Sequence, residues 1–338
     1  MKKNKLVFFD IPKENLKINC IYRNERLLKK SAAKSQNPET IPDAVKYYST
    51  EVMLPKPKKD RPYVISSIVL SADGKMAFSD SKAGPLIARN NYLDKDGALC
   101  DFWTLNMIRA YSDGVLFGTN TLFNEQGISS HVYDRSLNKQ RNEVLGKKHH
   151  PVGIALSLDG TDIPFDHFVF NIDPKEGYKV MIATSPEGCD YIKKNSPCKH
   201  IVYGPFKTKA DVDRFRFPDM YQKYDEIPLI VTGSGTKPNT KLFYYILRKM
   251  GMETVCIESP TYTSLTLKMG YLDEYFINYS MVYAGGKATP GYSMPSLATD
   301  HAHAELMSVG IHQDNFLYTR QKLVYNVTAN SSLEKYKY

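Results

Sequence analysis

The second half of the chain alternates short apolar runs with helix-like patterns, and this alternation restricts the possible folds more than any other feature. It consists of a strand pattern at 229–232, a helix pattern that begins at Asn239 or Thr240, a strand pattern at 254–257 and a helix pattern at 260–269. Asparagine and threonine are good helix N-caps, Gly251 suits the end of the first helix, and proline suits the first turn of the second. The order strand, helix, strand, helix predicts an α/β fold with parallel strands.

This unit also predicts where a ligand binds. A strand–helix–strand connection makes its two strands parallel and is right-handed almost without exception, so both strands end at the same edge of the sheet. We therefore expect Thr232–Gly235 to lie beside Glu258–Thr263, with hydroxyls and backbone N–H groups at two helix amino termini. Such an edge predicts a diphosphate site formed by Thr232, Gly233, Ser234, Gly235, Ser259, Pro260, Thr261, Tyr262 and Thr263.

The rest of the chain is patterned less regularly. Tyr63–Leu70 is typical of a strand covered on both faces, and Ser71–Lys75 after it has turn chemistry. Residues 99–108 suit a helix, short strands are indicated at 115–117, 152–158 and 179–183, and 185–217 shows no assignable pattern. Residues 1–60, with a strand pattern at 6–9 and a Lys/Pro-rich stretch at 55–59, are interpreted as an N-terminal extension and linker before one domain over 61–330.

Composition argues against several classes of protein. The five cysteines are scattered without a Cys-x-x-Cys pair, which disfavours a disulfide framework or a structural zinc site. The apolar stretches are far shorter than the ~20 residues that cross a bilayer, and no signal-peptide pattern opens the sequence. The net charge of +9 comes mostly from lysines in loops and tails, without a nucleic-acid-binding motif. We expect a cytoplasmic protein that binds neither membrane nor nucleic acid.

Three blocks of sequence are similar to one known family. The first is Ser71-Ala72-Asp73-Gly74-Lys75-Met76-Ala77, the second runs from Arg109 to Leu122 and contains Gly118-Thr119-Asn120-Thr121, and the third runs from Ile257-Glu258-Ser259-Pro260-Thr261 to Asp273-Glu274. In this order they resemble the reductase domain of the bacterial riboflavin-biosynthesis deaminase-reductase, in the dihydrofolate-reductase-like pyrimidine reductase family. The resemblance covers roughly residues 61 to 325.

The resemblance implies a dihydrofolate-reductase-like, mixed and mainly parallel sheet flanked by helices, with NADPH across the carboxyl ends of its strands. It places Gly118, Thr121, Glu125 and Ser259–Thr263 at the cofactor, and Gly84, Arg109 and Glu258 at a small-molecule substrate. It also implies a homodimer. The family's companion deaminase is not expected, because His303-Ala304-Glu305 and Pro197-Cys198 stand in the wrong order for its zinc motif and lack its second cysteine.

Three candidate residues each have a functional and a structural interpretation. Hydride transfer asks little of side chains, because the cofactor carries the chemistry. Glu258 is a substrate contact or proton relay, or else a carboxylate stabilised by a helix dipole. Asp73 is either catalytic or an ordinary turn residue. Arg109 either clamps a substrate phosphate or satisfies the carboxyl end of a helix.

Departures from the family pattern leave the function open. Glu125 stands in place of an aspartate, Ser67 in place of a strand lysine that faces the substrate, and Glu258-Ser259 in place of a Glu-Gly-Gly turn. The leading hypothesis is an NADPH-dependent reductase of a pyrimidine-type compound such as 5-amino-6-(5-phosphoribosylamino)uracil. The alternatives are a dihydrofolate- or pterin-type reductase, and a non-catalytic nucleotide-binding protein that retains the fold.

Cofactor preference and metal binding are two further expectations. No acidic residue follows the strand at 229–232 closely enough to bind a ribose 2'-hydroxyl, which favours NADPH over NADH. A 2'-phosphate would be surrounded by Thr232, Ser234, Thr236 and Lys237. His301-x-His303-x-Glu305 would place three metal ligands on one face of a strand. Nothing in the sequence nearby completes such a site, so we expect no metal.

Overall fold

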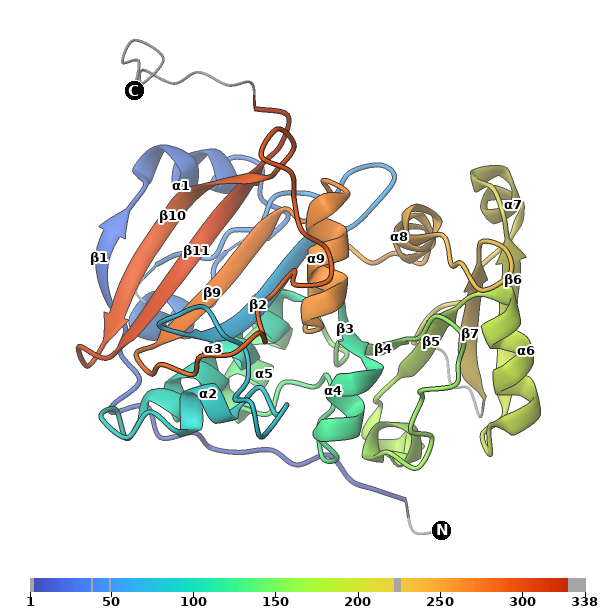
Figure 1. Ribbon diagram of the computed structural model, residues 1–338, viewed down its shortest axis with the longest axis horizontal. Coiled ribbons are helices and arrows are strands. Elements are labelled where there is room, and N and C mark those ends of the chain that lie inside the picture. Colours follow the sequence, from blue (N-terminus) through green and yellow to red (C-terminus); the bar gives the residue numbers. More distant parts are fainter. Residues whose placement is uncertain (1–2, 38, 49, 222–225, 328–338) are drawn as a thin grey trace.

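A computed structural model describes residues 3–37, 39–48, 50–221 and 226–327. One sheet runs through the molecule in the strand order β1-β10-β11-β9-β2-β8-β3-β4-β5-β7-β6 (Figure 1). The strands are β1 (Asn19–Arg23), β2 (Tyr63–Ser71), β3 (Gly114–Gly118), β4 (Val152–Leu156), β5 (Val180–Thr184), β6 (His200–Phe206), β7 (Ile227–Thr232), β8 (Thr254–Ile257), β9 (Glu274–Ser280), β10 (His303–His312) and β11 (Phe316–Val324). The helices are α1 (Glu25–Ala32), α2 (Leu86–Arg89), α3 (Gly97–Tyr111), α4 (Thr119–Asn124), α5 (Arg135–Glu143), α6 (Pro186–Asn195), α7 (Lys209–Arg214), α8 (Thr240–Lys249) and α9 (Pro260–Lys268).

Most neighbouring strands of this sheet are parallel. The strands from β9 to β6 in the sheet order run in one direction, and β11, β10 and β1 complete the sheet through antiparallel pairs. Buried parallel strands need cover on both faces. Side chains of α3, α5 and α6 join one apolar cluster, and those of α7 and α8 join another. The expected mixed, mainly parallel sheet flanked by helices is confirmed.

Local signals in the sequence explain where the helices of the second half begin and end. The side chain of Asn239 accepts a hydrogen bond from Leu242 N (3.0 Å) and caps α8. Gly251 follows α8 with a φ of +92°, a conformation that glycine adopts without a Cβ clash. Pro260 opens α9. The strand patterns at 229–232 and 254–257 are found as β7 and β8.

One expectation about this unit is wrong, because β7 and β8 are not neighbours. Three strands, β3, β4 and β5, lie between them. At ~4.8 Å per strand the two turns are therefore roughly 19 Å apart along the sheet. They still share one edge, because every pair of strands between them is parallel. The connection rule fixes the direction and hand of a crossover, but not how many strands it passes.

The described residues before 61 pack against this sheet. β1 pairs with β10 at one edge of the sheet, and α1 packs on β10 through Leu27, Leu28 and Met307. Leu16, Ile18, Ile41 and Leu54 join the larger apolar cluster. The strand pattern at 6–9 is not realised as a strand, since its structural counterpart is a single bridge between Phe9 and Asp134.

The stretch 185–217, which has no assignable sequence pattern, contains α6, β6 and α7. Ser185 caps α6, and Thr208 and Asp211 form a capping box at α7. β6 is an edge strand with partly exposed side chains, so its apolar pattern is weak. Within the described residues, every helix is too short or too polar to cross a membrane.

Candidate active site

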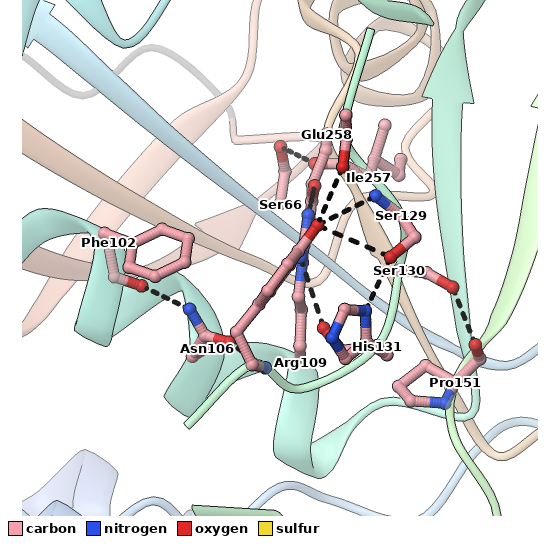
Figure 2. A network of polar contacts seen from close by, with 12 residues as sticks. Ser66, Phe102, Asn106, Arg109, Ser129, Ser130, His131, Pro151, Ile257 and Glu258 are labelled. Atoms are coloured by element: carbon pink, nitrogen blue, oxygen red, sulfur yellow. Dashed lines mark hydrogen bonds and ion pairs between the residues drawn. The ribbon is translucent and has the colours of Figure 1, made fainter. Parts of the chain in front are cut away.

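Glu258 and Arg109 form a buried ion pair at the carboxyl end of β8. Glu258 directly follows β8, and Arg109 lies in the last turn of α3. Arg109 Nε donates to Glu258 Oε1 (2.7 Å) and Nη2 donates to Oε2 (2.6 Å), while the two side chains are 1% and 7% exposed. Figure 2 shows the guanidinium pointing at the carboxylate. A bidentate pair of this kind fixes the orientation of the carboxylate.

Further contacts hold Arg109 in place. Its Nη1 donates to the carbonyl O of His131 (3.3 Å), and its guanidinium lies 5.7 Å from the centre of the Tyr133 ring. Burial alone would lower the pKa of Arg109, but the charge and hydrogen bonds of Glu258 outweigh burial and raise it. Arg109 therefore stays charged. The structure thus brings together two of the residues that the resemblance places at the substrate.

The start of α4 lies against the start of α9. Gly118 ends β3, which neighbours β8 in the sheet. A Cβ atom on Gly118 would lie 2.7 Å from Ser259 Oγ, so any larger residue would force Ser259 to move. Ser259 is buried, Thr121 is partly exposed and Thr261 is exposed. Gly118 and Ser259 of the expected cofactor site are therefore in close contact. Thr121 follows Gly118 by three residues, and Glu258 directly precedes Ser259.

Tyr262 and Thr263 point into the protein. Thr263 Oγ1 lies 2.8 Å from Ser66 Oγ, and Ser66 donates to Ile257 O (2.9 Å). The ring of Tyr262 packs against Phe243 and Tyr244 of α8. These two side chains of the expected cofactor site are thus packed behind the strand ends and do not join Gly118 and Ser259 at the edge.

Glu125 adds a second carboxyl group near the ion pair. It caps the carboxyl end of α4, and its carbonyl O accepts a hydrogen bond from His167 Nε2 (2.9 Å). Burial raises the pKa of the Glu125 side chain to about 7, the like charge of Glu258 adds to this effect, and Arg109 and Arg89 oppose it. Neighbouring carboxyl groups with different environments are a common basis for acid–base chemistry.

Asp73 and Gly84 lie in turns, Asp73 after β2 and Gly84 before α2. Asp73 accepts hydrogen bonds from Ser71 Oγ (2.6 Å), Ala284 N (3.1 Å) and Gly285 N (2.8 Å). These bonds, that from Ser71 first, lower the pKa of Asp73 to about 2. Asp73 is therefore ionised near neutral pH and joins two loops. Gly84 stands before α2, and a Cβ there would meet no described atom within 4 Å.

The turn after β7 is closed on itself. Thr232 Oγ1 accepts a hydrogen bond from Asn239 N (3.0 Å), so its hydroxyl is used within the turn. Gly233 has a φ of +85°, and a Cβ there would collide with the backbone of Lys237. Ser234 pairs with Lys237, and the exposed residues of the turn are Ser234, Gly235, Thr236 and Lys237.

A carboxylate reaches this turn from a different part of the chain. Glu187 lies in the first turn of α6, which follows the neighbouring strand β5. Its backbone N donates to Gly235 O (3.2 Å), and its Oε1 would lie 3.4 Å from a Cβ on Gly235. The lack of an acidic residue in the local sequence therefore does not by itself favour NADPH, because the neighbouring strand brings Glu187 to this turn.

The segment with His301, His303 and Glu305 does not present three ligands on one strand face. β10 begins only at His303, and His301 Nδ1 lies 3.2 Å from Leu297 O. Glu305 pairs with Arg26 (2.6 Å). Among the residues that the structure describes, no group of three or more His, Cys, Asp or Glu is placed to hold a metal ion.

The structure also reveals polar groups that sequence reasoning missed. Asp101 of α3 accepts from Asn278 Nδ2 of β9 (2.8 Å), and burial raises its pKa to about 6. The available signal is an acidic residue inside the largely apolar helix pattern at 99–108. His131 has no comparable signal, because its position next to Arg109 depends on the folding of a loop.

The sheet and the helices that cover it define a dihydrofolate-reductase-like fold of the pyrimidine-reductase type. A pyrimidine reductase-like protein from Corynebacterium diphtheriae matches 79% of this chain and 94% of its own length, with a TM-score of 0.55 and 15% identity. The Acinetobacter baumannii RibD protein matches 78% of this chain and 58% of its own length, with a TM-score of 0.50 and 16% identity. These neighbours confirm the fold that the resemblance implies. The sequence itself matches no protein-family model and no curated protein.

Proposed function

We propose that this protein is an NADPH-dependent reductase of a pyrimidine-type substrate such as 5-amino-6-(5-phosphoribosylamino)uracil. The observation that carries the proposal is the buried, bidentate Arg109–Glu258 pair at a strand end where two helices begin. It presents an oriented carboxylate at the edge where open α/β sheets bind ligands. A cytoplasmic homodimer, as the resemblance implies, is part of the same proposal.

The residues at this edge fit a nicotinamide dinucleotide. NADPH, when bound, supplies the hydride. The first N–H groups of α9 have no acceptor within the helix and suit an anionic oxygen, and Gly118 lets α4 approach them closely. Ser234, Thr236 and Lys237 are exposed at the second strand end. The net charge of +9 favours an anionic ligand in general.

The chain's own side chains would orient the substrate and hold a proton. Arg109 fixes the carboxylate of Glu258, which accepts hydrogen bonds from the N–H groups of an aminopyrimidine. Burial raises the pKa of Glu125 to about 7, with a further contribution from the charge of Glu258, so Glu125 is partly protonated near neutral pH and can supply or accept a proton. We therefore assign Arg109 to holding Glu258 instead of clamping a phosphate, and Asp73 to joining two loops instead of catalysis.

Steady-state oxidation of NADPH with a panel of substrates tests this function. Turnover of 5-amino-6-(5-phosphoribosylamino)uracil, without turnover of dihydrofolate, would support the proposal. Turnover of dihydrofolate or another pterin alone would favour the first alternative. NADPH binding without turnover of any panel member would indicate a nucleotide-binding protein, the alternative that Ser67 in place of the family's lysine favours.

A further inference from the structure

The segment 4–9 packs on His131 and Tyr133, two residues that contact Arg109 of the ion pair. Backbone hydrogen bonds fix both of its ends, since Asn4 N donates to Asn171 O (2.9 Å) and Phe9 N donates to Tyr133 O (2.8 Å). Between these ends, the carbonyl O of Val7 lies 2.8 Å from Nε2 of His131. His131 is only 1% exposed. A segment at the surface thus reaches a buried side chain through a direct hydrogen bond.

The hydrogen bonds of His131 define its tautomer. A carbonyl oxygen only accepts, so Nε2 carries the hydrogen and donates to Val7. Nδ1 is then the acceptor for Ser129 Oγ (2.5 Å). Burial lowers the pKa of His131 to about 3, and the charge of Arg109 acts in the same direction. His131 is therefore neutral near neutral pH, with each ring nitrogen in a fixed role.

The same stretch of chain packs around Arg109. The carbonyl O of His131 accepts a hydrogen bond from Arg109 Nη1, as Figure 2 shows. The centre of the His131 ring lies 3.9 Å from the centre of the Tyr133 ring, which in turn lies beside the Arg109 guanidinium. Phe8 packs edge-on against His131 (5.1 Å), and Phe9 stacks on Tyr133 (6.0 Å). Phe8 and Phe9 therefore pack on His131 and Tyr133, the two residues that contact Arg109.

We propose that segment 4–9 is a positioning element of the site. Through Val7, Phe8 and Phe9 it holds His131 and Tyr133, which in turn fix Arg109 and so the orientation of Glu258. The inference deepens the proposed function and rests on it, because Glu258 is the carboxylate assigned there to the substrate. His131 acts through Arg109 and is a positioning residue.

The first test needs no substrate. In protein with isotope-labelled arginine, hydrogen exchange at Arg109 Nε–H, assigned through R109K, reports how firmly the pair is held. H131F keeps a ring but removes the donor to Val7, whereas H131Q offers an amide N–H in its place. We expect exchange at least about tenfold faster in H131F, and close to the wild-type rate in H131Q. Arg320, whose Nε donates to Glu274 (2.8 Å) in a separate buried pair, is the internal control and should keep its rate.

A second variant covers the case in which H131F is globally destabilised. Such destabilisation would speed exchange at Arg109 and Arg320 together. In that case F8A is used in place of H131F. F8A weakens the packing of segment 4–9 on His131 but keeps the groups that form the hydrogen bonds of His131. Unchanged exchange at Arg109 in the folded variants, H131F or F8A, overturns the inference.

Kinetics provide the second test. H131F and F8A should lower kcat at least about fivefold while KM for NADPH stays within about twofold, and H131Q should recover most of kcat. Rates are divided by the fraction of folded protein, so that loss of fold is not counted as loss of positioning. Wild-type kcat per folded molecule in both variants overturns the inference. Lack of turnover in the wild type would count against the proposed function, and the exchange measurement would still decide the positioning role.

Discussion

The turns after β8 and β7 share a sequence pattern but form different surfaces. Each follows a buried parallel strand and precedes a helix. At the β8 turn Glu258 contacts Arg109 from α3, and Ser259 contacts Gly118 at the end of β3. At the β7 turn the hydroxyl of Thr232 closes its own loop. β8 lies in the middle of the sheet between β2 and β3, whereas β7 lies one strand from the edge.

This comparison shows that neighbouring elements turn a strand end into a site. The central strand end receives Arg109 from α3, which orients its carboxylate, and the like charge of this carboxylate helps to raise the pKa of Glu125 after α4. The outer one receives the single carboxylate of Glu187, at an exposed turn. We therefore expect the β8 turn to control turnover and the β7 turn to control only cofactor preference.

The largest effect is expected when the central ion pair loses its cation. R109M leaves Glu258 buried without a counter-charge, and removing one partner of a buried pair costs about 3–5 kcal/mol of unfolding free energy. Urea denaturation measures this loss. The double variant R109M/E258M, which removes both charges, should recover much of it. A change below about 1 kcal/mol in R109M would show that the pair is hydrated and contributes like a surface pair.

The next effect concerns turnover. E258Q keeps the shape of Glu258 but removes its charge, and we expect kcat to fall at least tenfold, about 1.4 kcal/mol in the barrier, with NADPH affinity within a few fold. The matched control is E305Q, at an exposed ion pair between β10 and α1, which should keep wild-type kcat. Unchanged turnover in E258Q would reduce Glu258 to a partner of the α9 dipole.

A smaller effect is expected in the pH dependence. The pKa of Glu125 is about 7 in the folded protein, so this group loses its proton as the pH rises through about 7. If the protonated form assists the reaction, kcat/KM should fall above that pH, and E125Q, which cannot ionise, should lack this decrease. E258Q removes the like charge and should move the decrease to lower pH. The same inflection in E125Q would assign it to another group.

The sequence predicts the parallel sheet well, because buried strands such as Tyr63–Leu70 are largely apolar and are followed by turn residues. Strand order is not predictable in this way, since a crossover can pass any number of strands. For the same reason the sequence places Glu187 far from Gly235, although β5 and β7 are neighbours in the sheet.

For the candidate site, the sequence suggests residues but not the interactions between them. The resemblance selects both Arg109 and Glu258, yet they are 149 positions apart, and only the packing of α3 on the sheet shows that they bind each other. Asp73 is ambiguous in sequence because, besides the local hydrogen bond from Ser71, it accepts hydrogen bonds from the N–H groups of Ala284 and Gly285, more than 200 positions away. Long-range contacts of this kind decide which of two plausible roles a residue has.

The smallest effect is expected at the β7 turn, in the preference between NADPH and NADH. The carboxylate of Glu187 lies beside Gly235, next to the exposed residues Ser234 and Lys237 that would receive a 2'-phosphate. Two unit charges about 4 Å apart interact by about 1 kcal/mol in water, and salt weakens this further.

We therefore expect E187Q to raise the ratio of NADPH to NADH affinity by about threefold at low salt, and less at high salt, as measured by calorimetric titration. S234D/K237E adds negative charge at the same turn and should shift the ratio in the opposite direction while sparing NADH. E305Q, which removes a carboxylate on β10, controls for the change in net charge and should leave the ratio unchanged. An unchanged ratio in both turn variants would show that the adenosine end of the cofactor binds elsewhere. The β7 turn would then not control cofactor preference.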